Sequence, residues 1–255
     1  MTRIITVTGA KGGTGKTTTV TNLASALVKK GKKVIILDAN VTTPNLSLHL
    51  GIPFYPMTFH DVLKSKISID EAVYTHSSGI KIVPASLASD AMNGVKFEKF
   101  ESAILNLLGQ ADIIILDAAA GLGREARAAI DVADEIIIVT NPELPAVTDA
   151  LKTVKVAEEI GTKVLGVVVN RVRGHDYEMA RKDIEDMLEV PILIEVPEDR
   201  AVPQSIYEKT PVVNLKPRSK SALKFKELAL IIAGEKVEQE IREKGWLEKF
   251  FGWMM

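Results

Sequence analysis

The segment from Gly9 to Thr18 has the residue types and spacing of a loop that cradles phosphate. It follows a short β-branched run and precedes a stretch with helical spacing, which is the setting that such a loop requires. Glycines let the backbone curl so that several N–H groups point at one phosphate, and the positive end of the following helix adds to the attraction. The segment reads Gly9-Ala10-Lys11-Gly12-Gly13-Thr14-Gly15-Lys16-Thr17-Thr18.

Two side chains of this loop are expected to act directly on a nucleoside triphosphate. Lys16 can reach the β- and γ-phosphates, and the hydroxyl group of Thr17 can bind Mg²⁺. The common form of the motif has a glycine five residues before Gly15, whereas this chain has Ala10 there and a second lysine, Lys11, at the loop entrance. The simpler alternative is a flexible glycine-rich turn, and the strand–loop–helix setting argues against it.

Two aspartates are candidates for holding the metal ion together with Thr17. Asp117 ends the apolar run that begins at Ile113, and Asp38 ends the run that begins at Val34. Ligands collect outside the carboxyl ends of parallel strands, so both carboxylates are expected at the same edge of a sheet as the loop. Either residue alone could instead cap a helix or lie on the surface. Together with the loop, they predict a Mg²⁺-nucleotide site.

The rest of the chain alternates apolar β-branched runs with segments of helical spacing. This alternation predicts an α/β fold with a mostly parallel sheet that is covered by helices on both faces. No linker or repeat interrupts it before about residue 234, which indicates one domain. The expected strands are Ile4–Thr8, Val34–Leu37, Ile80–Val83, Ile113–Leu116, Glu135–Thr140, Lys163–Val169 and Ile192–Val196. The expected helices are Thr17–Lys30, Glu98–Leu108, Leu144–Ile160, Glu178–Leu188 and Lys220–Ala233.

The composition excludes several classes of function. The chain of 255 residues has 32 basic and 33 acidic residues, and this balance argues against a protein that mainly neutralises nucleic-acid phosphates. It has no cysteine, so disulfides, thiolate zinc sites and Fe–S clusters are excluded. No apolar stretch approaches the roughly 18–20 residues needed to cross a bilayer, and the N-terminus lacks the pattern of a signal peptide. The expected compartment is therefore the cytoplasm.

These motifs resemble the MinD/ParA group of deviant Walker ATPases, and MinD-type proteins of cell-division site placement in particular. The resemblance covers nearly the whole chain. It rests on Lys11–Thr18, Asp38 with Asn45-Leu46, Asp117 with Ala120-Gly121, Ala133-Asp134-Glu135, Thr140-Asn141-Pro142-Glu143, Val169-Asn170-Arg171 and Val196-Pro197-Glu198-Asp199.

The resemblance implies a P-loop ATPase that uses ATP and Mg²⁺ and forms a homodimer when ATP is bound. It implies that Lys11 crosses the dimer interface to the phosphates of the partner, where it acts beside Lys16 in catalysis. The motifs that contain Asn170-Arg171 and Pro197-Glu198 are expected to bind the nucleotide at its adenine end. Asp149 is expected on a face that a protein partner or activator uses.

Two positions depart from the pattern of the group. The second strand usually ends in Asp-x-Asp, and the second aspartate orients or activates the attacking water, but here that residue is Asn40. An amide can hydrogen-bond a water but cannot accept its proton near neutral pH. Ala119 replaces a proline that is common after the metal-binding aspartate. We therefore expect slow hydrolysis and a long-lived ATP dimer. The alternative is that the rate of hydrolysis depends mostly on the positioning of the metal and the phosphate, in which case Asn40 would lower the rate only a little.

The last residues form a separate segment that is rich in aromatic residues. The sequence predicts an ATPase domain over residues 1–234, and a charged linker with an amphipathic tail over residues 235–255. Six apolar side chains of the tail fall on one face of an expected helix, which suits the plane of a membrane interface. The alternatives are packing on the domain or an oligomer contact. The six are Trp246, Leu247, Phe250, Phe251, Trp253 and Met254.

A single tail of this size would bind a membrane weakly, whereas two tails in a dimer act together. The expected location is therefore peripheral, on the inner face of the cell membrane. Basic and acidic residues nearly balance in the tail, so only a mild preference for anionic lipid is expected. Two rival functions stay open: a partition ATPase that moves on DNA, and a nucleotide-locked adaptor with little catalysis. His49 and His60 lie in no cluster with ligand spacing, and we expect them to serve packing.

Overall fold

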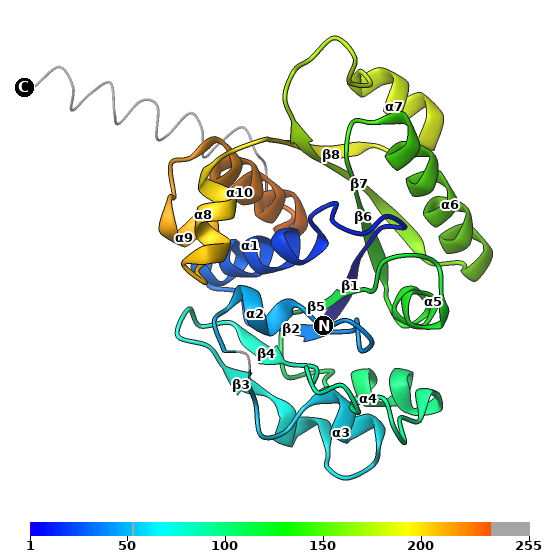
Figure 1. Ribbon diagram of the computed structural model, residues 1–255, viewed down its shortest axis with the longest axis vertical. Coiled ribbons are helices and arrows are strands. Elements are labelled where there is room, and N and C mark those ends of the chain that lie inside the picture. The colour runs from blue at the N-terminus through cyan, green and yellow to red at the C-terminus, as the bar shows by residue number, and fades with distance from the viewer. Residues whose placement is uncertain (53, 236–255) are drawn as a thin grey trace, which may run out of the picture.

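The computed structural model describes residues 1–52 and 54–235, which form one eight-stranded sheet with helices on both faces (Figure 1). The strand order is β3-β4-β2-β5-β1-β6-β7-β8. Within the sheet, the pair β3–β4 is antiparallel and every other pair is parallel. The strands are β1 (Arg3–Thr8), β2 (Val34–Asp38), β3 (Tyr74–Thr75), β4 (Lys81–Val83), β5 (Ile113–Asp117), β6 (Glu135–Thr140), β7 (Lys163–Val172) and β8 (Ile192–Pro197).

The central strands are buried on both faces, as their continuous apolar runs predict. Every residue of β2 and β5 is buried, and these two strands pair in register so that Asp38 lies opposite Asp117. On its other side β5 pairs with β1, where Val7 lies opposite Asp117. The phosphate-loop segment follows β1 directly. The register therefore brings both aspartates and the loop to the same carboxyl edge of the sheet.

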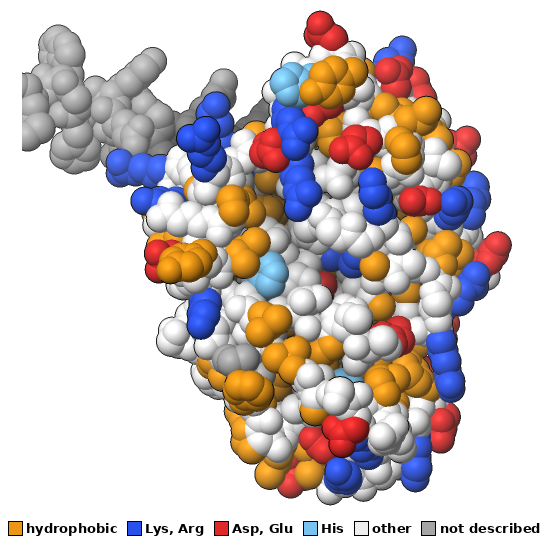
Figure 2. Space-filling model, in the orientation of Figure 1, with side chains coloured by type: hydrophobic (Ala, Val, Ile, Leu, Met, Phe, Trp, Pro, Cys, Tyr) orange, Lys and Arg blue, Asp and Glu red, His pale blue; other side chains and the backbone are white. Residues whose placement is uncertain are grey.

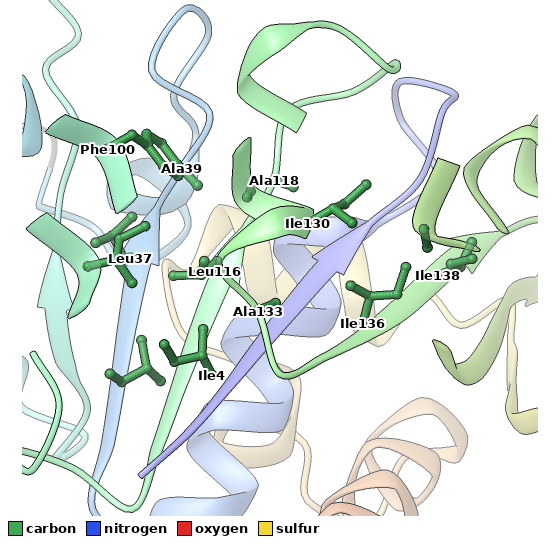
Figure 3. Close-up of a cluster of buried hydrophobic side chains, with 14 of the residues drawn as sticks. Ile4, Leu37, Ala39, Phe100, Leu116, Ala118, Ile130, Ala133, Ile136 and Ile138 are labelled. Atoms are coloured by element: carbon green, nitrogen blue, oxygen red, sulfur yellow. The ribbon is translucent and has the colours of Figure 1, made fainter. Parts of the chain in front are cut away.

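Two layers of helices cover the sheet and divide its side chains into two cores. One core packs strand residues such as Ile4, Leu37 and Leu116 against Phe100 and Ile130 of the helices on that face (Figure 3). The helices on this face are α3 (Phe59–Leu63), α4 (Phe100–Leu105), α5 (Arg124–Asp131), α6 (Leu144–Ile160) and α7 (Arg181–Leu188). The helices on the opposite face are α1 (Lys16–Lys29), α2 (Leu46–His49), α8 (Ala201–Tyr207), α9 (Val212–Leu215) and α10 (Lys220–Ala233).

The fold class and each expected strand agree with the structure, but several short elements were not predicted. Helix α5 was missed because its sequence, REARAAID, has only one large apolar residue, Ile130. The expected helix Glu98–Leu108 is shorter, since a 3₁₀ turn (η2, Phe97–Lys99) precedes α4 and turns follow it. Another 3₁₀ turn, η1 (Ile69–Ala72), follows α3. Among the described residues, no helix is long and apolar enough to cross a membrane. The expected amphipathic tail lies outside the described residues.

Candidate functional site

A pocket of about 330 Å³ opens at the carboxyl edge of the sheet, where the loops after β1, β2 and β5 meet. It lies over the N-terminus of α1, and the space-filling view shows a hollow in this central part of the surface (Figure 2). The residues lining it come from five separate stretches of sequence. They include Gly12, Gly13, Gly15, Lys16, Thr17, Thr18, Asn40, Thr43, Asn45, His49, Ala118, Ala120, Arg171 and Ile206.

The wall of the pocket nearest α1 has the properties of an anion site. Gly13 and Gly15 adopt positive φ angles of 77° and 104°, a conformation that glycine reaches without steric cost. Gly15 is the residue that caps α1, and no side chain caps the helix. The first N–H groups of a helix have no partner within the helix, and the first turn of α1 contains no acidic residue. These donors are therefore available to a phosphate, as the sequence predicted.

Lys16, Thr17 and Asp117 form a buried polar chain at the floor of this pocket. The Thr17 hydroxyl donates a hydrogen bond of 2.7 Å to Oδ2 of Asp117. Lys16 is only 8% exposed, and its Nζ lies 3.4 Å from the backbone oxygen of Lys11. Burial lowers the pKa of Lys16, and the charge of Asp117 partly opposes that shift. Burial raises the pKa of Asp117 to about 6, against the effects of the Thr17 hydrogen bond and the Lys16 charge.

Asp38 lies beside Asp117, but its oxygens are occupied by the backbone of its own loop. Its Oδ2 accepts hydrogen bonds from the N–H groups of Asn45 and Leu46 at 3.1 and 3.0 Å. Its Oδ1 accepts a longer one, 3.3 Å, from the N–H of Asn40. Burial and the neighbouring charge of Asp117 raise the pKa of Asp38 well above its usual range. In this arrangement Asp38 orders the loop that follows β2.

The oxygen atoms around Thr17 and Asp117 fit a Mg²⁺ ion. Magnesium prefers oxygen ligands and usually takes one or two carboxylates together with phosphate oxygens. Oδ1 of Asp117 is buried without a hydrogen-bond partner, so it is available as a ligand beside the Thr17 hydroxyl. Residues 1–52 and 54–235 contain no group of three or more His, Cys, Asp or Glu side chains that could hold an ion without such phosphate oxygens.

A second pocket, of about 680 Å³, continues from the first and contains the residues expected at the adenine end. The two pockets share Gly15, Thr18, Arg171 and Ile206. The second pocket also contains Asn170, Pro197 and Glu198, which the sequence singled out, and Arg173, Arg200 and Lys220, which it did not. The first pocket would take the phosphates of a nucleotide, and the larger second pocket would take its sugar and base.

Asn170 connects the second pocket to the phosphate loop. Its Nδ2 donates a 2.7 Å hydrogen bond to the backbone oxygen of Thr14, and the side chain is 8% exposed. Arg171, which follows it, has a positive φ of 59°, and such strain in a non-glycine residue is typical of functional sites. Glu198 pairs with Arg173, with 3.1 Å between Oε1 and Nη2. The strand end at β7 therefore supports both pockets.

The two residues that resemblance assigned to contacts between chains both lie outside the first pocket. Lys11 is exposed, and its Nζ lies 3.5 Å from Oε2 of Glu143, the residue before α6. Asp149 lies on α6 and pairs with Lys152 at 2.8 Å. In this structure Lys11 points toward the start of α6, so it is not turned into the phosphate site of its own chain.

Asn40 lies at the pocket rim, with its side chain bonded within its own loop. Its Nδ2 donates to the backbone oxygen of Thr43 at 2.5 Å. Its Oδ1 accepts from the N–H and the hydroxyl of Thr43 at 3.2 and 3.1 Å. An aspartate could not donate the first of these bonds, and its carboxylate would face the carbonyl oxygen of Thr43. The amide therefore stabilises a loop conformation that a carboxylate would not hold in the same way.

His60 holds the same loop from the opposite side, so its structural role agrees with the packing role expected from the sequence. The ring is 1% exposed, and its Nε2 donates to the backbone oxygen of Val41 at 3.0 Å. Its Nδ1 accepts from the N–H of Ser86 at 3.0 Å, and this fixes the neutral tautomer with the proton on Nε2. Burial lowers the pKa of His60; the Val41 hydrogen bond and Asp61 oppose the shift, whereas Lys64 adds to it.

We expect the contribution of His60 to stability to depend on pH. Because the pKa of His60 is lowered on folding, the unfolded chain binds the extra proton as the pH falls below about 6.5. At neutral pH, His60→Gln should lower the free energy of unfolding by about 1–2 kcal/mol relative to wild type. This loss should shrink as the pH falls below about 6.5, because proton binding by the unfolded chain has already lowered the wild-type free energy of unfolding there.

Urea unfolding of both proteins, followed by circular dichroism across this pH range, measures the difference. His49, whose pKa burial also lowers, is present in both proteins and cancels. The matched control is His175→Gln, which removes an imidazole that is exposed beside Tyr177. A loss in His60→Gln that stays constant with pH would contradict the assigned hydrogen bonds.

Several residues of the site could not be found from motifs. Thr43, His49 and Ile206 line the first pocket, and Arg173 and Arg200 line the second. They lie on loops and short helices with no recognisable spacing, and only the tertiary fold brings them to the pocket. His49, for which we expected a packing role, lines the first pocket instead, and its position soon after the Asn45-Leu46 motif could have indicated this.

Comparison with known proteins places the chain in one family. The model of the CobQ/CobB/MinD/ParA nucleotide-binding domain matches residues 5–212. An uncharacterized ATP-binding protein of Methanocaldococcus jannaschii is 39% identical over 248 residues, which cover 96% of this chain and 94% of that protein. The septum site-determining protein MinD of Pyrococcus horikoshii, solved in complex with Mg-ADP, is 36% identical with a TM-score of 0.87; the match covers 91% of this chain and 96% of that chain.

A more distant structural relative comes from a protein complex. A chain of the MinC:MinD cell division protein complex of Aquifex aeolicus is 27% identical with a TM-score of 0.82, and the match covers 92% of this chain and 96% of that chain. The family model, the high coverage of the relatives and the phosphate-binding geometry agree with one another. The chain belongs to the CobQ/CobB/MinD/ParA nucleotide-binding domain family.

Proposed function

We propose that this protein is a MinD-like switch that binds ATP with Mg²⁺, dimerises on it, and hydrolyses it slowly. The observation that carries this proposal is the hydrogen bond from Thr17 to the buried Asp117 beneath the N-terminus of α1. That pair forms the metal side of a nucleoside triphosphate site, and the adjoining larger pocket provides room for the base and sugar. The nucleotides bound by relatives support the choice of ATP.

Each part of the site would have a defined task in hydrolysis. The N–H groups at the start of α1 and the ammonium of Lys16 would hold the phosphates and balance the charge that builds up in the transition state. Thr17, Asp117 and Asp38 would hold the metal, directly or through ordered water, and Mg²⁺ would neutralise phosphate charge. Asn40 would place the attacking water. Lys11 of a second copy would complete the site, so that catalysis waits for dimerisation.

The same proposal divides the chain into an ATPase domain, residues 1–234, and a membrane-binding tail, residues 235–255. The six apolar tail residues from Trp246 to Met254 would lie in a membrane interface, and pairing two tails could tighten binding by roughly 10²–10⁴. The protein would then reside peripherally on the inner face of the cell membrane. The MinC:MinD complex supports a protein partner, for which we propose the face of α6 around Asp149.

Sedimentation with vesicles tests the switch directly. Binding of the full chain is expected with Mg²⁺ and a nonhydrolysable ATP analogue, and not with ADP or without nucleotide. Analytical ultracentrifugation under the same conditions should show a dimer, which Lys11→Ala should prevent. A wild-type chain that stays monomeric and does not bind vesicles with the analogue would contradict the proposal.

The hydrogen bonds of Asn40 favour a second candidate, a nucleotide-locked adaptor with little turnover. We expect Asn40→Asp to raise steady-state phosphate release by about tenfold, because a carboxylate can accept a proton from the attacking water. The carboxylate would also be repelled by the backbone oxygen of Thr43, which accepts a hydrogen bond from the Asn40 amide, and so would be released from the loop. Asn40→Ala is the matched control, because it breaks the same loop contacts without adding a base. Equal rates for wild type and Asn40→Asp would show that the amide does not limit hydrolysis.

A further inference from the structure

Two long segments of the chain contain basic residues and no acidic ones. Residues 1–37 contain seven basic residues, and residues 209–226 contain six. The other 19 basic residues share the rest of the chain with all 33 acidic residues. The overall net charge of −1 therefore conceals a strong separation of charge.

The two segments pack together in the fold. They contribute α1, α9 and α10, which lie side by side on one face of the sheet (Figure 1). Nζ of Lys29, at the end of α1, donates a 3.0 Å hydrogen bond to the backbone oxygen of Val213 in α9. The basic residues at the end of α1 consequently lie beside those that follow α9. Figure 2 shows Lys and Arg side chains over the α10 side of the molecule, with apolar side chains between them.

We call the exposed and half-buried cations of this region the basic face, and they are only partly neutralised. The basic face consists of Lys29, Lys30, Lys32, Lys33, Lys209, Lys216, Arg218, Lys220, Lys224 and Lys226. Lys30 pairs with Glu235 and Lys224 with Glu227, each at 2.7 Å. Among the described side chains, Lys32, Lys33, Lys216 and Arg218 make no ion pair. Leu223 stands exposed on the outer side of α10, within the basic face.

The basic face adjoins the point where the chain leaves the domain. The pair Lys30–Glu235 joins the end of α1 to the last described residue. The ten residues between Glu235 and Trp246 can span at most about 35 Å, whereas α10 is about 21 Å long. The linker is therefore long enough for the tail to reach a membrane that the basic face touches. The tail itself, residues 236–255, has four basic and four acidic residues and brings no net charge.

We propose that the basic face binds the anionic headgroups of the membrane, so that the domain supplies a preference for anionic lipid that the neutral tail lacks. The inference rests on the proposed membrane role of the tail. Cations near an anionic leaflet are attracted within about a Debye length, and the tail holds the domain at that distance. This proposal differs from the expectation for the tail alone, because it assigns the lipid preference to charges at the end of α1 and around α9 and α10.

The test is sedimentation of the full chain, with Mg²⁺ and a nonhydrolysable ATP analogue, on vesicles of phosphatidylcholine alone or mixed with phosphatidylglycerol. The variant replaces four cations: Lys32→Gln, Lys33→Gln, Lys216→Gln and Arg218→Gln. The matched control removes the same charge elsewhere: Lys81→Gln, Lys96→Gln, Lys99→Gln and Lys182→Gln. Thermal unfolding of both variants checks that each domain is folded.

We expect wild type and control to bind the anionic vesicles more tightly than the neutral ones. The four-site variant should lose on the order of 10²-fold in affinity for anionic vesicles. Its binding to neutral vesicles should be unchanged. Equal binding of wild type to both vesicles, or an equal loss in the control, would overturn the inference. Salt-sensitive binding of duplex DNA that the variant abolishes, without any lipid preference, would assign the face to nucleic acid instead.

A tail variant separates this inference from the proposed function. Phe250→Ser with Trp253→Ser should remove binding to neutral vesicles. Any binding to anionic vesicles that remains in this variant then comes from the basic face. If these substitutions change nothing and the anionic preference persists, the tail's role fails and the basic face stands. If the tail variant loses binding to neutral vesicles and the anionic preference disappears only with the four cations, both stand.

Discussion

Lys16→Ala is expected to lower steady-state phosphate release by at least about 10³-fold, the loss typical when a cation that faces transition-state charge is removed. The structure supports a large effect because Lys16 is 8% exposed at the floor of the phosphate pocket. Alanine there leaves Asp117 without its nearest cation, and no other lysine replaces it, since Lys11 pairs with Glu143 at 3.5 Å. The phosphates of the nucleotide would then be repelled by the carboxylate of Asp117 at the floor of the pocket.

The same variant separates binding from catalysis. Binding of a fluorescent ATP analogue should weaken as well, but by less than turnover, since the N–H groups of α1 still hold the phosphates. Lys182→Ala, which removes an exposed lysine from α7, should keep wild-type values for both. Phosphate release by Lys16→Ala within an order of magnitude of wild type would show that the pocket is not the catalytic site.

The parts of the site that motifs encode could be predicted from the sequence. The phosphate loop and Asp117 are local patterns, because a glycine-rich turn must follow one strand and a carboxylate must end the next buried run. The register of parallel strands then brings them together, as the pairing of Asp38 opposite Asp117 shows. The sequence also indicated the layers of the fold, since fully apolar strands require cover on both faces.

The contacts that order the loop after β2 could not be predicted, because each joins residues far apart in sequence. Glu125 of α5 accepts hydrogen bonds from the N–H and the hydroxyl of Thr42. His60 holds Val41. No motif records these partners, since any donor at the right place would serve. Together they attach the loop after β2 to α3 and α5.

The uneven distribution of charge along the chain is present in the sequence, but the overall net charge of −1 hides it. Summed over the chain, basic and acidic residues nearly cancel, which argued against a protein that mainly neutralises nucleic-acid phosphates. The fold packs the two acid-free segments into one layer, so their charges add on one side of the molecule. Net charge describes solubility, whereas the distribution over packed elements decides what a surface can bind.

Gly15→Ala is expected to destabilise the domain by about 2–4 kcal/mol, combining left-handed backbone strain with a lost buried hydrogen bond. Gly15 has a φ of 104°, and a Cβ there would lie 2.2 Å from Nδ2 of Asn170. To relieve that contact Asn170 must move, which breaks its 2.7 Å bond to the backbone oxygen of Thr14. The start of α1 and the wall shared by both pockets would shift together, so nucleotide affinity should fall by at least about 10²-fold.

Gly13 provides a control that separates the cost of left-handed backbone strain from the cost of the contact between a new Cβ and Asn170. Gly13 has a φ of 77°, but a Cβ there would meet nothing within 4 Å, so Gly13→Ala should cost only about 1–2 kcal/mol. Adding Asn170→Ala to Gly15→Ala removes the collision but keeps the strain, and the double variant should be more stable than the sum of the single losses implies. Urea unfolding followed by far-ultraviolet circular dichroism measures wild type, Gly13→Ala, Gly15→Ala, Asn170→Ala and the double variant. If Gly15→Ala costs no more than Gly13→Ala, or if the two losses at Gly15 and Asn170 simply add, Asn170 does not set the shape of the phosphate loop.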